Sequence, residues 1–110
     1  MLDLPGAVLE NVRRILNEHV PGMEVWAYGS RVTEQSHPGS DLDLVVRNPS
    51  DLLQPVAGLN RLRTAFRESD IPILVDVFDW ARMPQSFREE IEREHVAVQD
   101  GAARARTATS

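Results

Sequence analysis

Lysine and cysteine are both absent from the 110-residue sequence, and each absence excludes a group of chemistries. Without cysteine the chain forms no disulfide and offers neither a thiol nucleophile nor a cysteine-ligated zinc site. Because all twelve basic residues are arginine, a P-loop lysine, a Schiff base and a lysyl-nucleotide intermediate are excluded as well. Any catalysis must therefore use carboxylates, hydroxyl groups, histidine or arginine.

The sequence also lacks a long apolar run and a surplus of positive charge. No apolar segment approaches the ~20 residues that span a bilayer, and the N-terminal residues lack the layout of a signal peptide. We therefore expect a soluble, cytoplasmic protein without a membrane partner. The net charge of −5 argues against direct nucleic-acid binding, because phosphate backbones are bound mainly by positive charge.

The pattern of apolar residues predicts one α/β (α+β) domain over residues 1–100, followed by a disordered tail over 101–110. Helices are predicted at 5–19, from a cap at Ser50 or Asp51 to about 69, and at 84–94; strands are predicted at 24–28, 42–47, 73–78 and 96–98. The short link between the first two strands favours an antiparallel pair. The helix between the second and third strands favours a parallel crossover.

Asp41 and Asp43 stand at the start of the second predicted strand, one residue apart. Side chains alternate along a strand, so both carboxylates project to one face while Leu42 and Leu44 point to the other. Two neighbouring acids repel each other unless a cation lies between them, and Mg²⁺ prefers such oxygen ligands. The alternative is a solvated acidic loop, which the tripeptide taken alone favours.

Gly29-Ser30 ends the first predicted strand and favours the metal site over the solvated loop. Glycine lets the backbone turn sharply and approach a ligand, and a following helical turn would offer N–H groups and the serine hydroxyl to an anion. Taken alone, the dipeptide is more often an ordinary turn. It becomes informative because this turn and the acidic pair could meet at the ends of adjacent strands.

Asp76 lies inside the apolar third strand, where an unpaired carboxylate would be costly. A buried salt bridge to an arginine would explain it equally well. If the third strand lies beside the second, Asp76 completes a cluster of three carboxylates with Asp41 and Asp43. Asp79 competes for this role, but it stands at the strand's exit and is better placed to cap or turn the chain.

Taken together, these motifs resemble the minimal nucleotidyltransferases of the DNA polymerase β superfamily. Gly29-Ser30, ten intervening residues and Asp41-Leu42-Asp43 match that family's signature, and the segments 75–80 and 87–91 resemble its third-acid strand and last helix. The resemblance covers roughly residues 5–99. It implies a nucleotidyltransferase fold, with a mixed sheet of three to four strands and about four helices. One departure is that Arg31 is followed by Val-Thr-Glu, where many relatives have Ala-Arg-Gly.

The resemblance also implies a mechanism with ATP as substrate and a site for two Mg²⁺ ions. Asp41, Asp43 and Asp76 would be the metal-binding and catalytic residues, with Asp76 as general base. The nucleotide-binding residues would be Gly29, Ser30, Arg31 and Ser40. Stand-alone domains of this family are typically paired with a HEPN-domain toxin, and they act as its antitoxin by transferring AMP to a toxin tyrosine.

Two other functions remain open at this point. The protein could neutralise a partner by binding alone, although binding would not require three clustered acids. It could also modify a small molecule such as an aminoglycoside, although that class generally has a further domain for the acceptor.

Overall fold

The computed structural model describes residues 2–101, so the predicted tail lies outside the described residues except for Gly101. Its helices are α1 (Gly6–His19), α2 (Leu59–Arg67) and α3 (Gln85–Arg93), with a 3-10 turn, η1 (Trp80–Arg82). Its strands are β1 (Glu24–Tyr28), β2 (Leu42–Arg47), β3 (Val75–Asp79) and β4 (Val96–Gln99). The mixed α+β architecture predicted from the sequence is confirmed. No helix among the described residues is long and apolar enough to cross a membrane.

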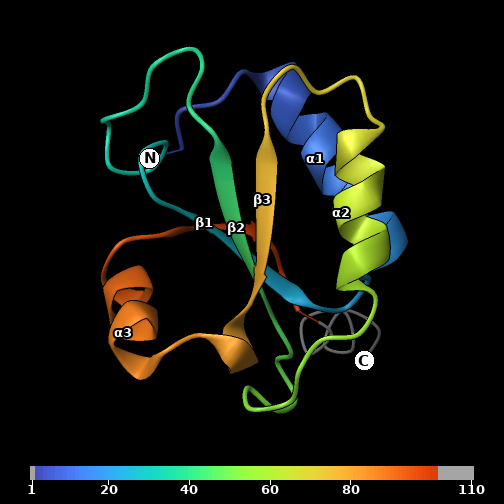
Figure 1. Ribbon diagram of the computed structural model, residues 1–110, viewed down its shortest axis with the longest axis vertical. Coiled ribbons are helices and arrows are strands. Elements are labelled where there is room, and N and C mark those ends of the chain that lie inside the picture. Colours follow the sequence, from blue (N-terminus) through green and yellow to red (C-terminus); the bar gives the residue numbers. More distant parts are fainter. Residues whose placement is uncertain (1, 102–110) are drawn as a thin grey trace, which may run out of the picture.

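The four strands form one mixed sheet in the order β3-β2-β1-β4 (Figure 1). β1 pairs antiparallel with β2 and with β4, whereas β2 pairs parallel with β3. Both predicted strand directions are therefore confirmed. The order also places β2, which carries Asp43, between β1, which Gly29 follows, and β3, which carries Asp76.

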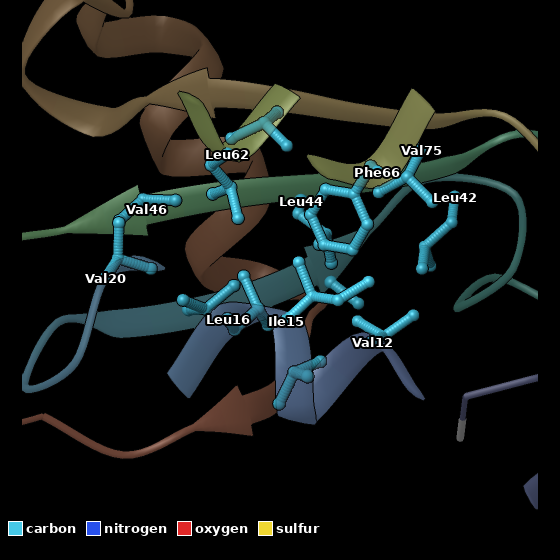
Figure 2. Close-up of a cluster of buried hydrophobic side chains, with 14 of the residues drawn as sticks. Val12, Ile15, Leu16, Val20, Leu42, Leu44, Val46, Leu62, Phe66 and Val75 are labelled. Atoms are coloured by element: carbon cyan, nitrogen blue, oxygen red, sulfur yellow. The ribbon is translucent and has the colours of Figure 1, made fainter. Parts of the chain in front are cut away.

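The main core fills the space between one face of the sheet and the helices α1 and α2, which lie side by side (Figures 1 and 2). Leu42, Leu44 and Val46 alternate along β2 toward this core, and Leu16 and Leu62 meet them from the two helices. Burying such side chains supplies the main driving force for folding. Because side chains alternate along a strand, the odd-numbered residues of β2 must face away from this core. The functional side chains of β2 are therefore expected on that second face.

The second face of the sheet is only partly covered. Three buried side chains pack on Tyr28 and Val45 there: Trp80 from η1, Met83 from the link to α3, and Ile91 from α3. The guanidinium group of Arg47 lies over the ring of Trp26 at 3.8 Å and near that of Trp80 at 4.4 Å, a cation–π arrangement. These contacts cover the end of the face that carries Arg47.

The helix predicted from Ser50 or Asp51 is wrong in its first half, because the helix begins only at Leu59. Gly58 has a φ of +86°, a left-handed conformation that cannot continue a helix from the preceding residues. The Asp51 carboxylate accepts a hydrogen bond from the Leu53 amide and thereby holds a turn instead of a helix cap. Leu53 is 74% exposed, so it does not pack against the core as a residue on the apolar face of a helix would.

Candidate active site

The first element of the site is the turn that follows β1. Gly29 has a φ of +84°, and its carbonyl accepts hydrogen bonds from the amides of Val32 (2.9 Å) and Thr33 (3.0 Å). Because left-handed φ values are strained for other residues, the sequence needs glycine here. A β-carbon at this position would lie 2.7 Å from Oδ2 of Asp43. The turn and the acidic strand therefore touch, as the spacing of the two motifs suggested.

The second element is a pair of carboxylates on neighbouring strands. Asp43 in β2 is the direct partner of Asp76 in the parallel strand β3, and adjacent strands lie about 4.8 Å apart. Asp41 precedes β2 by one residue and shares the alternation of Asp43. This placement of β3 beside β2 is the condition under which Asp76 was expected to join Asp41 and Asp43. It brings the three predicted acids to one edge of the sheet's partly covered face.

The electrostatics of this edge are unfavourable for isolated carboxylates. Burial, followed by the charges of Asp76 and Asp41, raises the pKa of Asp43 from 3.8 to about 6. Within residues 2–101, the carboxylates of Asp41, Asp43 and Asp76 and the hydroxyl of Ser30 make no hydrogen bond or ion pair. A cation between the acids would relieve their repulsion, and phosphate oxygens could reach the unoccupied donor of Ser30.

The donor set fits a hard cation such as Mg²⁺, which binds through one or two carboxylates together with substrate phosphates. Among the described residues, no three His, Cys, Asp or Glu side chains are arranged to hold one ion as they stand. Asp43 and Asp76 would therefore hold such an ion as a neighbouring pair, with Asp41 beside them. The remaining ligands would come from the nucleotide and from water.

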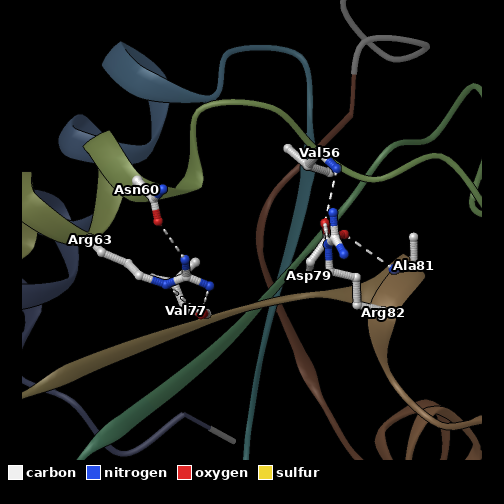
Figure 3. A network of polar contacts seen from close by, with 7 residues as sticks. All are labelled: Val56, Asn60, Arg63, Val77, Asp79, Ala81 and Arg82. Carbon is white, nitrogen blue, oxygen red and sulfur yellow. Dashed lines mark hydrogen bonds and ion pairs between the residues drawn. The ribbon is translucent and has the colours of Figure 1, made fainter.

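Asp79 belongs to a different network, shown in Figure 3. It lies on the face of β3 opposite to Asp76, and its carboxylate accepts hydrogen bonds from the amides of Ala81 (3.2 Å) and Val56 (3.1 Å). Arg82 approaches the same carboxylate at 3.5 Å. Asp79 thus caps η1 and anchors the segment before α2, which confirms the prediction that it caps or turns the chain.

Arg31 and Ser40 shape the loop that leads into the acidic strand. Arg31 is 5% exposed, and its guanidinium group donates to the carbonyl of Ser40 through Nε (3.0 Å) and Nη2 (2.9 Å). It also donates to the carbonyl of Asp3 (2.9 Å), while the Ser40 hydroxyl accepts from the His37 amide (2.9 Å). These contacts position the loop before Asp41. The contact of Arg31 or Ser40 with a nucleotide stays a prediction.

Sequence reasoning overlooked three aromatic residues beside the acids. Tyr28 pairs with Asp43 across β1 and β2, and burial together with the charges of Asp43 and Asp76 raises its pKa, so its hydroxyl stays protonated. Phe78 and Phe87 lie against Tyr28, with ring centroids 6.3 and 5.9 Å away. A hollow of about 350 Å³ lies beside Tyr28, Gly29 and Phe87. Strand alternation could have found Tyr28, because it shares a face with Trp26 directly before the Gly29 turn.

Paired carboxylates that lie against a glycine turn form an arrangement suited to an enzyme that binds a divalent metal together with phosphate groups. The sequence profile of the nucleotidyltransferase domain family matches residues 9–101, and the chain belongs to this family. The protein is therefore a nucleotidyltransferase, as the resemblance of its motifs predicted.

Two similar proteins extend the comparison. The probable protein adenylyltransferase MntA of Haemophilus influenzae is 42% identical over 101 residues, which cover 90% of this chain and 85% of that protein. A solved chain described as a toxin-antitoxin with AMP-PNP shares the fold, with a TM-score of 0.67 over 92% of this chain and 86% of its own. At 14% identity, this second likeness concerns the fold alone.

Proposed function

We propose that the protein is a Mg²⁺-dependent adenylyltransferase that transfers AMP from ATP to a tyrosine of a HEPN-domain toxin and thereby acts as its antitoxin. The observation that carries the catalytic part is the contact of Gly29 with Asp43, whose neighbour on the next strand is Asp76. The similarity to a probable protein adenylyltransferase supports AMP transfer to a protein. The HEPN-domain toxin as partner is taken from the resemblance of the motifs to the minimal nucleotidyltransferases, and a chain of the same fold occurs in a toxin-antitoxin structure.

On this proposal each part of the site has one task. The Ser30 hydroxyl and the backbone of the turn bind the terminal phosphates of ATP, because they offer donors next to the carboxylates. Asp43 and Asp76 would hold the metal as a neighbouring pair, with Asp41 beside them. When bound, Mg²⁺ neutralises charge on the phosphates and lowers the pKa of an adjacent hydroxyl.

The reaction itself is an in-line displacement. The acceptor oxygen forms a bond to the α-phosphorus while the bond from that phosphorus to the oxygen bridging to the β-phosphorus breaks, and pyrophosphate leaves. Asp76 accepts the proton of the acceptor hydroxyl, because it lies on the strand farthest from the turn that holds the leaving phosphates. Atoms and charge balance with AMP on the acceptor and pyrophosphate released.

The test is to co-express the protein with a HEPN-domain partner and to measure the mass of the partner after incubation with ATP and Mg²⁺. We expect an addition of one AMP on a tyrosine, lost in Asp43→Asn and in Asp76→Asn. Asp70→Asn, an exposed acid outside the site, is the matched control. A partner that carries no AMP, yet is neutralised equally by the wild type and by Asp43→Asn, would instead establish an antitoxin that acts by binding alone.

A further inference from the structure

Phe78 is an exposed aromatic ring on the same strand and the same face as Asp76. Asp76 and Phe78 are separated by one residue in β3, and such residues lie about 7 Å apart on one face. Val77, which lies between them, and Asp79, which follows Phe78, are both buried on the opposite face. Phe78 is nevertheless 41% exposed, which leaves part of a large apolar ring uncovered beside the proposed general base.

The position of Phe78 within the sheet places it on one side of the reaction. Gly29 follows β1, Asp43 lies in β2, and Asp76 and Phe78 lie in β3, the edge strand. An in-line displacement requires the attacking and leaving oxygens on opposite sides of the α-phosphorus. If the terminal phosphates lie at Gly29, the acceptor must approach from β3. Phe78 therefore lies on the acceptor's side of the site, on a strand that β2 separates from β1 and its phosphate turn.

The surroundings of Phe78 favour an aromatic acceptor. Its ring lies against that of Tyr28 at 6.3 Å with an interplanar angle of 56°, within the range of favourable aromatic pairs. Tyr28 is itself buried, so it backs Phe78 and holds the ring on the surface. A third ring at this place would extend an existing aromatic cluster, whereas a short serine or threonine side chain would leave Phe78 uncovered.

Resting on the proposed function, we propose that Phe78 binds the ring of the acceptor tyrosine and so selects a phenol over an aliphatic hydroxyl. A tyrosine carries its hydroxyl at the far end of a rigid side chain whose length is comparable to the spacing between Phe78 and Asp76. With its ring against Phe78, its hydroxyl reaches the Asp76 carboxylate. The phenolic oxygen then forms the new bond to the α-phosphorus, its proton passes to Asp76, and pyrophosphate leaves.

The experiment measures AMP transfer from ATP with Mg²⁺ to peptide libraries whose central residue is tyrosine, serine or threonine. The wild type should modify the tyrosine library at least tenfold faster than the other two. Phe78→Ala should raise the KM for tyrosine peptides about tenfold, whereas Phe78→Tyr, which keeps a ring, should restore it. The dissociation constant of a non-hydrolysable ATP analogue should change less than twofold in both variants.

Leu74→Ala is the matched control, because Leu74 is 56% exposed. It lies two residues before Asp76, just as Phe78 lies two residues after it. This control variant should leave the acceptor KM within twofold of wild type. Equal use of serine peptides, a weakened nucleotide affinity in Phe78→Ala, or an acceptor effect in Leu74→Ala alone would each overturn the inference. Absence of any AMP adduct in wild-type reactions, with the libraries and with the HEPN-domain partner, would instead refute the proposed function.

Discussion

Gly29 lies so close to Asp43 that a β-carbon at residue 29 would stand 2.7 Å from the Asp43 Oδ2 atom. This one contact joins the phosphate turn to the acidic strand. Only glycine, which has no β-carbon and tolerates a left-handed φ, allows this approach. The backbone of the turn after β1 therefore lies directly against the carboxylate of β2.

Gly29→Ala should therefore abolish transfer, with a loss of at least about 100-fold, and lower the free energy of unfolding by about 1–2 kcal/mol. The added methyl group would displace the Asp43 carboxylate, and the φ of +84° would strain alanine. Transfer assays and urea unfolding measure both effects. Gly6→Ala is the control, because its β-carbon would meet no atom within 4 Å; equal behaviour of the two variants would contradict the prediction.

Asp43→Asn should stabilise the metal-free protein at neutral pH by about 1 kcal/mol, a value reduced for the partial exposure of this side chain. The pKa of Asp43 is about 6 in the folded state and 3.8 ordinarily, so the folded state binds more protons between these values. The contribution of Asp43 to wild-type stability consequently falls as the pH rises from about 4 to 6, and the variant escapes this loss. Urea unfolding at pH 3.5 and pH 7 measures it. The stabilisation should be absent at pH 3.5, and a variant equally stabilised at both pH values would contradict the pKa assignment.

Mg²⁺ with a non-hydrolysable ATP analogue should raise the melting temperature of the wild type, because a ligand that binds only the folded state stabilises it. At a concentration 100-fold above the dissociation constant, the gain is about 2.7 kcal/mol. Asp43→Asn and Asp76→Asn should lose most of this shift, and chelation should remove it from the wild type. Thermal denaturation measures each case, and a full shift in both variants would argue against a shared metal site.

Arg31→Ala should lower the free energy of unfolding by about 2–4 kcal/mol, because it leaves several backbone carbonyls without their donor. Arg31→Lys should recover little, since one ammonium group cannot reproduce the guanidinium fork. Exposed Arg61→Ala is the control, with an expected change below about 0.5 kcal/mol. If Arg31→Ala is as stable as this control but binds nucleotide poorly, Arg31 is a nucleotide ligand and does not hold the loop.

The misplaced start of α2 illustrates where local reasoning fails. The residues from Ser50 to Gly58 carry a cap candidate and apolar residues at helical spacing, and both signals favour a helix. The structure instead holds this segment by a hydrogen bond from the Val56 amide to Asp79, 23 residues away. A contact between residues so far apart in the chain cannot be predicted from the pattern of neighbouring residues, and it outweighs a weak helical preference.

By itself, the sequence determined the chemistry available to this protein and the local geometry of its motifs. The absence of lysine and cysteine, the alternation of Asp41 and Asp43, and the turn at Gly29 all follow from residue type and spacing. Only the tertiary structure decided that Asp76 neighbours Asp43, that Asp79 faces the other way and that Phe78 is exposed beside Asp76. These relationships depend on strand order, which is settled when one face of the sheet buries its apolar residues against α1 and α2.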